Sequence, residues 1–481
     1  MSILAFLPIF IAVTGGFFLW KLRAFFLLHP VRTFKMLHGA FSRDAASFRT
    51  LMLALAGTLG VGNITGVAVG MLLGGAGSVF WLLVSAAFAT VLKYAESVLT
   101  AHGSHSDGMI GVIRTSLPAG RRLAPVYAFL CLGLSFSLGG ALQCRATAGA
   151  AEAFYDFSPS VASTIFVLLL FFCFLGGAEK IMQKTAVLIP ITAVMYIILC
   201  IITILSNITG LASALSLILS SAFSPSAAVS GVLGYLLSES VREGFCRGLL
   251  SNEAGAGTST LAHAKNHGVT PAAEGVLGMC EVFFDTVLLC MLTALSLLLG
   301  AGDPRGYTDG FSYLAAAFSS SGFGAWRPVL LLCFFSFAVA TSLCWYFYGE
   351  VALTALGGKK KRRTFYPFFF LVLTGVGGIL SEIFLVRVCD LLLFFAGILS
   401  LAALLYGADT VRRETLAAHL MTGGESPREA RVRSSRGRMC NRPSPASKMR
   451  THPHRKQDAS PVESAGRNPS ALREETHTVF R

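Results

Sequence analysis

The sequence predicts an all-α polytopic membrane protein with about eleven transmembrane helices, two of which are interrupted. Three observations predict this class. The chain of 481 residues is 54% hydrophobic and only 13% charged, which excludes an ordinary soluble globular protein. Apolar runs long enough to cross a bilayer core of roughly 30 Å recur along the chain. Two of these runs are interrupted by glycines and polar residues, which weaken a membrane helix.

The first 50 residues predict an N-terminal transmembrane helix followed by a basic cytoplasmic loop. The apolar run 3–20 lacks a basic leading segment and a convincing cleavage site, so we interpret it as a retained helix rather than a signal peptide. Lys and Arg gather in 21–49 and in GKKKRRT, 358–364, whereas the loops expected at 143–160 and 301–327 carry no such excess. This asymmetry predicts a protein of the plasma (inner) membrane with its N-terminus outside and its C-terminus in the cytoplasm. Termini on opposite sides require an odd number of spans.

The first interruption is AGTLGVGNITGVAVG, residues 56–70, in a stretch that carries no charge between 51 and 73. Where such a helix opens, its freed N–H and C=O groups need partners in protein, ions or water. A half-helix that starts after the break directs N–H groups at an anion, and unwound carbonyls can coordinate Na⁺. The alternative is close helix packing, for which Gly62 and Gly66 have the right spacing. Packing alone leaves Asn63 and the second interruption unexplained.

The second interruption is RGLLSNEAGAGTSTLAHA, residues 247–264, which mixes glycines with polar residues: Ser251, Asn252, Glu253, Gly255 and Gly257. Without the first helix, ten spans remain, and five begin with each interruption. Because five is odd, the second set crosses the membrane in the opposite direction. The sequence therefore predicts two inverted five-helix repeats, 51–206 and 207–410. Interrupted helices in matching positions of such repeats indicate the binding site of a secondary transporter.

Residues 411–481 predict a disordered basic cytoplasmic tail. They contain fifteen Lys or Arg and seven Asp or Glu, are rich in Ser, Pro and Arg, and have few apolar residues. A basic tail can bind nucleic acid, and KKKRR resembles a nuclear signal. Cytoplasmic charge beside an anionic lipid leaflet explains both features, so we expect the lipid bilayer and no nucleic acid as a partner.

The remaining motifs indicate neither an enzyme nor a metal centre. The eleven cysteines are scattered without a CxxC pair and are interpreted as small core residues. His263 and His267 have the spacing of a zinc protease, but Ala264 stands where its general-base glutamate would be. We interpret them as satisfied loop histidines. No nucleophile elbow, phosphate-binding loop or ATPase motif is present, so nucleotide-driven transport has no support.

Four segments resemble those of the alanine or glycine:cation symporter family. The family segments GTxGxGNIxGVA, KYAE, SNEAGxGxxxxAHA and GWSYYGE correspond here to GTLGVGNITGVA (57–68), KYAE (93–96), SNEAGAGTSTLAHA (251–264) and CWYFYGE (344–350). The match runs in order from about residue 10 to residue 410. The resemblance implies a fold like that of the bacterial leucine transporter LeuT, a 5+5 inverted repeat, here with one extra N-terminal helix. It also implies import of a small neutral amino acid, alanine or glycine, by symport with sodium or protons.

The resemblance also assigns residues. It implies that the amino-acid carboxylate binds at Gly60, Gly62 and Asn63, that Gln143 lines the substrate site, and that Thr341 and Trp345 shape the pocket around a short side chain. It implies a sodium ion, as the coupling ion, between the first interruption and the ninth span, at Gly57, Thr58, Thr341 and Ser342.

Several positions depart from the family pattern. Gly139–Gly140 replaces Gly–Asn, Arg145 replaces a small or polar residue, and Ala340 and Cys344 stand where a hydroxyl residue and a glycine are expected. The sequence therefore leaves open proton coupling and a non-transporting sensor or channel of the same fold. We expect sodium, because the proposed ligands do not titrate near neutral pH. We interpret Glu253 as a structural partner of backbone N–H groups or Arg247, and it is the main candidate for a proton carrier if protons are coupled. Asp285 and Glu350 are expected near helix ends.

Overall fold

A computed structural model describes residues 7–23, 28–43, 45–103, 105–174, 177–223, 238–266, 269–357 and 360–422. Within these ranges every regular element is a helix. Two elements precede the repeats. The apolar helix α1 (Leu7–Lys21) packs against α6, and the amphipathic helix α3 (Pro30–Arg43) packs against α17. The predicted N-terminal apolar run thus forms a helix, α1.

The first half of the chain forms the following elements: α4 (Ala45–Thr58), η2 (Val61–Asn63), α5 (Thr65–Gly74), α6 (Ser78–His102), α7 (Met109–Ser116), α8 (Gly120–Phe136), η3 (Ser137–Ala141), α9 (Leu142–Tyr155), α10 (Pro159–Phe174) and α11 (Gly177–Ser206). The segments α8, η3 and α9 make one continuous helix, with a π-helical turn in η3. A loop was expected at 143–160, but the residues up to Tyr155 are helical, so this part of the expectation is wrong. Its alanine-rich sequence favours the helix.

The second half forms these elements: η4 (Ile208–Gly210), α12 (Leu211–Ala222), α15 (Glu239–Asn252), α16 (Thr260–His263), α17 (Pro271–Val282), η5 (Phe283–Cys290), α18 (Met291–Ala301), η6 (Pro304–Gly306), α19 (Gly310–Ser319), α20 (Trp326–Ala355), α21 (Lys360–Gly377) and α22 (Glu382–Thr422). The helix α22 continues past residue 411, where the tail was expected to begin. Buried Val411 and Thr415 hold this extension against the protein. The remainder of the predicted tail, 423–481, lies outside the described residues.

Both predicted interruptions are real breaks. The first helix ends at Thr58 and resumes at Thr65, with only a single 3₁₀ turn between the two halves. The second ends at Asn252 and resumes at Thr260. In the second break Glu253, Gly255 and Gly257 have φ angles of 54°, 86° and 75°. Positive φ is accessible to glycine without steric cost, which explains two of the glycines in this motif.

In the described part of the chain, six helices are long and apolar enough to cross a membrane: Ser78–His102, Gly120–Tyr155, Gln183–Ser206, Pro271–Ala301, Trp326–Ala355 and Glu382–His419. Five further apolar helices are shorter: Ile9–Lys21, Thr65–Gly74, Pro159–Phe174, Ile208–Ala222 and Phe365–Gly377. The described residues thus form an all-helical membrane architecture, in which the expected count of about eleven spans is not confirmed. One reason is that a broken helix contributes two halves, each below spanning length.

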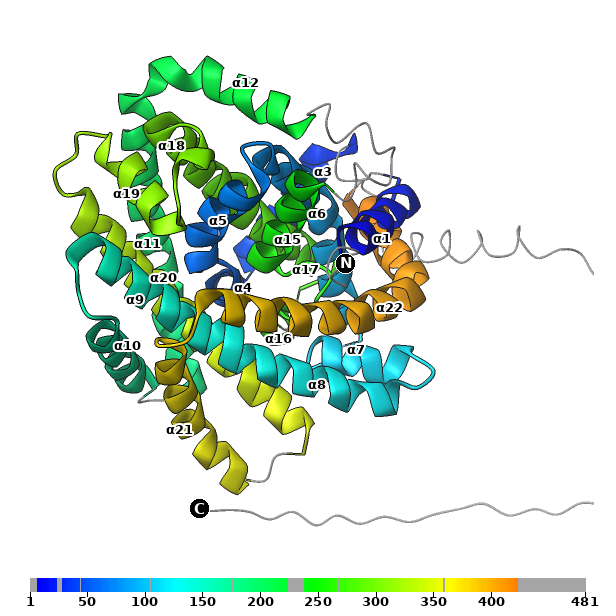
Figure 1. Ribbon diagram of the computed structural model, residues 1–481. Coiled ribbons are helices and arrows are strands. Elements are labelled where there is room, and N and C mark those ends of the chain that lie inside the picture. Colours follow the sequence, from blue (N-terminus) through cyan, green and yellow to red (C-terminus); the bar gives the residue numbers. More distant parts are fainter. Residues whose placement is uncertain are drawn as a thin grey trace, which may run out of the picture. The chain divides into compact units, whose positions relative to one another are not determined.

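The two broken helices meet around α6. This helix packs against both α15 and α17, while α5 also packs against α15. Figure 1 shows these helices in the middle of the view, with α10, α12 and α21 at its margins. Large apolar side chains on these marginal helices, such as Phe172, Leu219 and Phe368, are more than half exposed. That exposure suits contact with lipid chains, whereas the polar residues of the breaks are buried.

Candidate functional site

The first break directs its N–H groups at two amide side chains. The Gly60 N–H donates to Asn63 Oδ1 and the Val61 N–H donates to Gln143 Oε1, both at 3.4 Å. Gln143 comes from α9, directly after the π-helical turn, and its Nε2 donates to the Leu138 carbonyl at 3.0 Å. The structure therefore brings Gly60, Asn63 and Gln143 together, as expected. The Val61 bond is long, so this N–H group is weakly held, whereas the Gly60 N–H also donates to the Thr58 carbonyl at 2.9 Å.

The two central glycines of this break have different surroundings. A Cβ atom on Gly60 would lie 2.9 Å from Thr341 Oγ1 and 3.3 Å from Gln143 Oε1. A Cβ atom on Gly62 would meet no atom within 4 Å. Gly60 is thus required for close packing, whereas Gly62 borders open space beside the break. Of these two glycines, Gly62 is the one that leaves room for a bound molecule.

The helix α20 covers the carbonyl side of the first break. Thr341 Oγ1 donates to the Leu59 carbonyl, and Trp345 Nε1 donates to the Gly57 carbonyl, both at 3.3 Å. Trp345 is fully buried and its ring packs edge-on against Tyr348. Position 57 favours glycine, because a Cβ atom there would lie 3.1 Å from both Cys344 Sγ and Tyr348 Oη. Thr341 and Trp345 therefore reach the break from one helix face.

The remaining expected sodium ligands are placed less favourably. Thr58 Oγ1 donates to carbonyls of its own helix, those of Ala54 at 3.5 Å and Leu55 at 3.4 Å. Ser342 Oγ instead donates to the Gly139 carbonyl at 2.5 Å, on the other side of α20. Carbonyl oxygens at the end of α4 and the Thr341 hydroxyl thus share a face of the break. Ser342 belongs to the contact with η3.

Asp285 connects the two breaks, a role that the sequence did not predict. It lies in the π-helical segment η5, is fully buried, and accepts a hydrogen bond from Asn63 Nδ2 in the first break. Its carboxylate also accepts from Ser251 Oγ at 2.6 Å and from Thr286 Oγ1 at 2.7 Å. The expectation of a position near a helix end was wrong. Asp285 lies in the middle of the continuous helix Pro271–Ala301.

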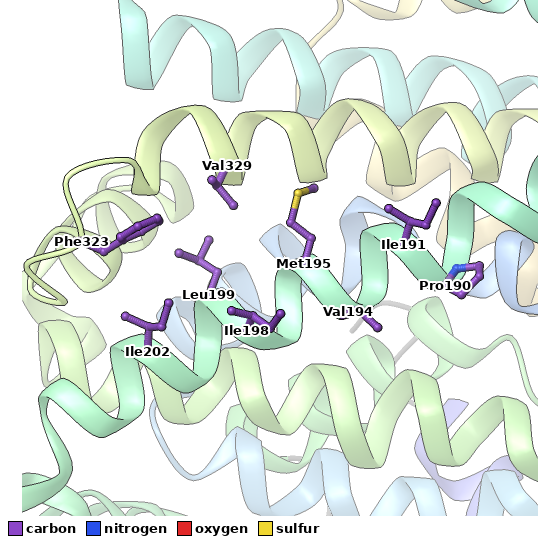
Figure 2. A pocket seen from close by; sticks show the side chains of 9 residues that line it. All are labelled: Pro190, Ile191, Val194, Met195, Ile198, Leu199, Ile202, Phe323 and Val329. Atoms are coloured by element: carbon purple, nitrogen blue, oxygen red, sulfur yellow. The ribbon is translucent and has the colours of Figure 1, made fainter.

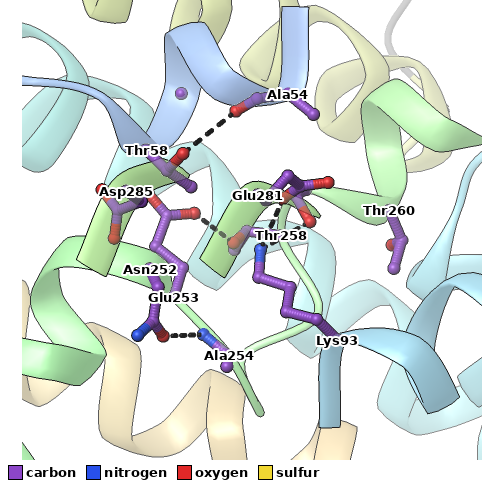
Figure 3. Close-up of polar contacts among 12 residues, drawn as sticks. Ala54, Thr58, Lys93, Asn252, Glu253, Ala254, Thr258, Thr260, Glu281 and Asp285 are labelled. Carbon is purple, nitrogen blue, oxygen red and sulfur yellow. Dashed lines mark hydrogen bonds and ion pairs between the residues drawn. The ribbon is translucent and has the colours of Figure 1, made fainter. Parts of the chain in front are cut away.

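The second break is held by its own polar residues. Ser251 bonds to Asp285, Asn252 Nδ2 donates to Thr286 Oγ1 at 3.1 Å, and Asn252 Oδ1 accepts from the Ala254 N–H at 3.0 Å. Thr258 Oγ1 donates to the Glu253 carboxylate (Figure 3). Arg247 bonds Glu243 at 3.0 Å, so the suggested pairing of Arg247 with Glu253 is wrong. Glu243 and Arg247 are four residues apart in α15, so both side chains lie on the same face of the helix.

A buried ionic network adjoins the second break. Lys93 on α6 donates to Ser259 Oγ at 2.7 Å and to Glu281 Oε2 at 3.0 Å (Figure 3). Glu281 also bonds His263, whose other ring nitrogen bonds Glu274. All four ionisable side chains are at most 2% exposed. His263 is thus satisfied, as expected, but in the buried core and not in a loop; His267 lies outside the described residues.

The signal for this network was present in the sequence. Lys93 and Glu96 stand in an otherwise apolar 25-residue helix, and Glu274, Glu281 and Asp285 stand in another. Ionisable residues inside spans are functional candidates by default. KYAE contributed to the family resemblance but received no role, because the helix that pairs with it could not be inferred from the sequence.

An apolar groove lies elsewhere in the protein. A groove of about 570 Å³ between α11 and the start of α20 is lined by apolar side chains: Pro190, Ile191, Val194, Met195, Ile198, Leu199, Ile202, Phe323 and Val329 (Figure 2). It contains none of the predicted site residues. An apolar lining suits hydrocarbon and offers nothing to hold a charged or zwitterionic molecule.

Two interrupted helices that meet through buried polar residues, inside an all-helical membrane fold, define a membrane transporter. The same fold occurs in a manganese transporter from Eremococcus coleocola, which aligns with a TM-score of 0.50 and 14% identity over 82% of this chain and 92% of that chain. The chain itself belongs to the sodium:alanine symporter family, which it matches over residues 1–417. The predicted family is confirmed.

Relatives in this family include proteins named for alanine transport. The sodium/alanine symporter AgcS of Methanococcus maripaludis is 32% identical over 344 residues, 68% of this chain and 74% of the relative. A sodium/proton-dependent alanine carrier protein of Bacillus sp. is 28% identical over 66% of this chain and 75% of its own length. An uncharacterized transporter of Haemophilus influenzae is 31% identical, covering 70% and 75%.

Proposed function

We propose that this protein imports a small neutral amino acid, of the alanine or glycine class, by symport with sodium across the plasma membrane. The observation that carries the proposal is the first break. Its Val61 N–H is weakly held by the Gln143 amide, and open space begins at Gly62. Backbone N–H groups at a helix start suit a carboxylate.

The cation is proposed to lie on the opposite side of the same break. The Leu59 carbonyl accepts from the Thr341 hydroxyl there, and the Gly57 carbonyl accepts from Trp345 on the same helix. Sodium is a hard cation that prefers such neutral oxygens. Ser342 joins this set only if its hydroxyl turns away from the Gly139 carbonyl. Placing the ion beside the substrate carboxylate gives a direct electrostatic reason for coupling.

Asp285 supports recognition of the amino group. A zwitterionic amino acid needs a partner for its ammonium as well as its carboxylate, and Asp285 is bonded to Asn63 of the first break and Ser251 of the second. We propose that its carboxylate attracts the substrate ammonium. Because Asp285 contacts both breaks, substrate binding there would affect both halves together.

Small side chains are favoured by the walls of the site. Trp345 is fully buried beside Gly57, and the Gly60 backbone is packed against Thr341 and Gln143. Such packing leaves little volume for a large substituent. The N-terminus is proposed to face outward and the C-terminus inward, as the positive-inside pattern predicts.

A proton is the second candidate for the coupling ion. The observation that favours it is the set of buried carboxylates around the second break, Glu96 and Glu253 among them. A relative is also named for dependence on both sodium and protons. A sensor that binds the amino acid without moving it, or a channel, would use the same first break but would show no accumulation against a gradient.

Equilibrium binding tests the proposal directly. Alanine binding to the purified protein in detergent is measured by scintillation proximity at fixed pH, with sodium replaced by choline in the control. The proposal expects sodium to tighten alanine binding and leucine to compete poorly. Equal alanine affinity in sodium and in choline would contradict sodium coupling, and an absence of alanine or glycine binding in both would contradict the substrate class.

A further inference from the structure

Glu96 is a buried carboxylate that the site described above does not use. It lies on α6, three residues after Lys93, and is 0% exposed. Neither carboxylate oxygen accepts a hydrogen bond from another side chain within the described part of the chain. The side chain faces the backbone N–H groups of Gly255 and Gly257 in the second break. Burying an ionised carboxylate without a side-chain donor costs free energy unless a cation or a proton binds to it.

The buried charges around the second break do not balance. Seven ionisable side chains there are at most 2% exposed, two of them basic and five acidic: Lys93, His263, Glu96, Glu253, Glu274, Glu281 and Asp285. Even with both basic groups charged, ionisation of all five carboxylates would leave an excess of negative charge in a region shielded from water. At least one carboxylate must therefore hold a proton or a cation for part of the transport cycle.

The hydrogen bonds indicate which carboxylate is exchangeable. Glu281 accepts from Lys93 and bonds His263, and Glu274 bonds His263 and Asn266. Asp285 accepts from three side chains, and Glu253 accepts from Thr258. Each of these bonds stabilises the ionised form of its acceptor. Among these five acidic groups, Glu96 is the one that accepts no hydrogen bond from a side chain; it faces backbone N–H groups instead.

Other groups near Glu96 are already engaged or neutral. The charged and titratable groups facing it are Lys93 on its own helix, Glu281 on α17 and Tyr127 on α8. Lys93 is bonded to Glu281 and Ser259, and Tyr127 donates to the Ala256 carbonyl at 2.6 Å. From α22, the neutral Ser400 hydroxyl lies 2.8 Å from the position of a Cβ on Gly257. Glu253 in the second break also interacts electrostatically with Lys93.

We propose that Glu96 is the proton-binding residue of this transporter and that its protonation controls the second break. The inference rests on the proposed transport function and adds a residue and a second ion to it. Ionised Glu96 attracts the N–H groups of Gly255 and Gly257 and holds the break in the conformation described here. A proton taken from water on one side forms an O–H bond on the carboxylate and removes this attraction. The break can then rearrange, and the proton returns to water on the other side.

Proton movement in proteoliposomes tests the inference. The full-length protein is reconstituted with pyranine inside the vesicles, the membrane potential is clamped, and sodium is equal on both sides. Radioactive alanine entry and internal acidification are recorded together. The inference expects wild type to acidify the interior when alanine enters, Glu96→Gln to lose acidification while retaining alanine–alanine exchange, and Glu96→Asp to restore it. Glu152→Gln, which changes an exposed carboxylate on α9, is the matched control and should behave as wild type.

The outcomes separate this inference from the proposed function. Sodium-dependent alanine uptake without proton entry in wild type would overturn the role of Glu96 and leave sodium symport standing. Acidification that persists in Glu96→Gln would overturn it as well. If Glu96→Gln does not fold, the pH dependence of uptake by Glu96→Asp decides: a shifted midpoint supports the inference, and an unchanged midpoint overturns it. Wild type without any alanine transport would contradict the proposed function itself.

Discussion

At the scale of single residues, Gly60 and Gly62 form a matched pair. Gly62→Leu should leave the protein folded but abolish alanine binding and uptake, because the side chain fills the open space beside the break. Gly60→Ala should instead lower thermal stability, since its methyl group would lie 2.9 Å from Thr341 Oγ1. Expression, unfolding temperature and uptake of both variants check this. Near-wild-type uptake by a well-folded Gly62→Leu protein would contradict the site.

Trp345 is expected to set the upper size of the substrate. Trp345→Ala should let leucine compete with alanine, by removing bulk rather than by adding attraction. Truncation of this fully buried side chain also removes about 3–5 kcal/mol of stability, so the variant needs a control that keeps bulk. Trp345→Phe loses the N–H that donates to the Gly57 carbonyl but keeps a ring. It should retain alanine selectivity. If leucine still competed poorly in Trp345→Ala, Trp345 would not limit the size of the substrate.

Asp285 is expected to contribute charge rather than shape. Asp285→Asn keeps the volume and can still bond Ser251 and Thr286, but it no longer attracts an ammonium group. Alanine affinity should fall by at least about tenfold, the equivalent of roughly 1.4 kcal/mol, with little change in unfolding temperature. Thr286→Val, which removes a neighbouring hydroxyl without changing charge, serves as the control. If Asp285→Asn bound alanine with wild-type affinity, Asp285 would only connect the two breaks and would not recognise the ammonium group.

At the scale of elements, the Lys93–Glu281–His263 network is expected to hold α6, α16 and α17 together. Glu281→Gln leaves two buried basic groups without a shared carboxylate, and breaking such a pair costs about 3–5 kcal/mol. Thermal unfolding in detergent should therefore show a clear fall in unfolding temperature for Glu281→Gln. The exposed Glu152→Gln variant should unfold like wild type. Equal unfolding temperatures for both variants would mean that the network adds nothing to stability.

The two broken helices could be predicted because their cause is local. A glycine cluster in an uncharged stretch weakens a helix wherever it stands, so the breaks at 59–64 and 253–259 follow from composition. The partners of the breaks depend on which helices pack together. Asp285 and Lys93 were therefore missed as parts of the site, and Arg247 was given the wrong carboxylate. Helix ends were missed where alanine-rich or charged residues extend a helix, as in α9 and α22.

At the scale of the whole molecule, the membrane class and the family follow from the sequence, whereas the number of spans does not. Hydropathy identifies apolar runs, but six described helices reach spanning length and five are shorter. Broken, tilted or kinked helices are not resolved by run length alone. The proposed inverted repeat agrees with one broken helix in each half, α4–α5 and α15–α16. Coupling is a property of the whole transport cycle, which neither the sequence nor one conformation contains.

Sodium-driven accumulation of alanine tests the central claim most directly. Proteoliposomes containing the full-length protein are given an inward sodium gradient at equal pH on both sides, and radioactive alanine uptake is followed against sodium concentration. The account predicts saturable, sodium-dependent accumulation above the external alanine concentration in wild type. Thr341→Ala should require more sodium for the same rate, because its hydroxyl faces the carbonyls of the first break. Accumulation that is indifferent to sodium, or no accumulation at any sodium concentration, would contradict the account.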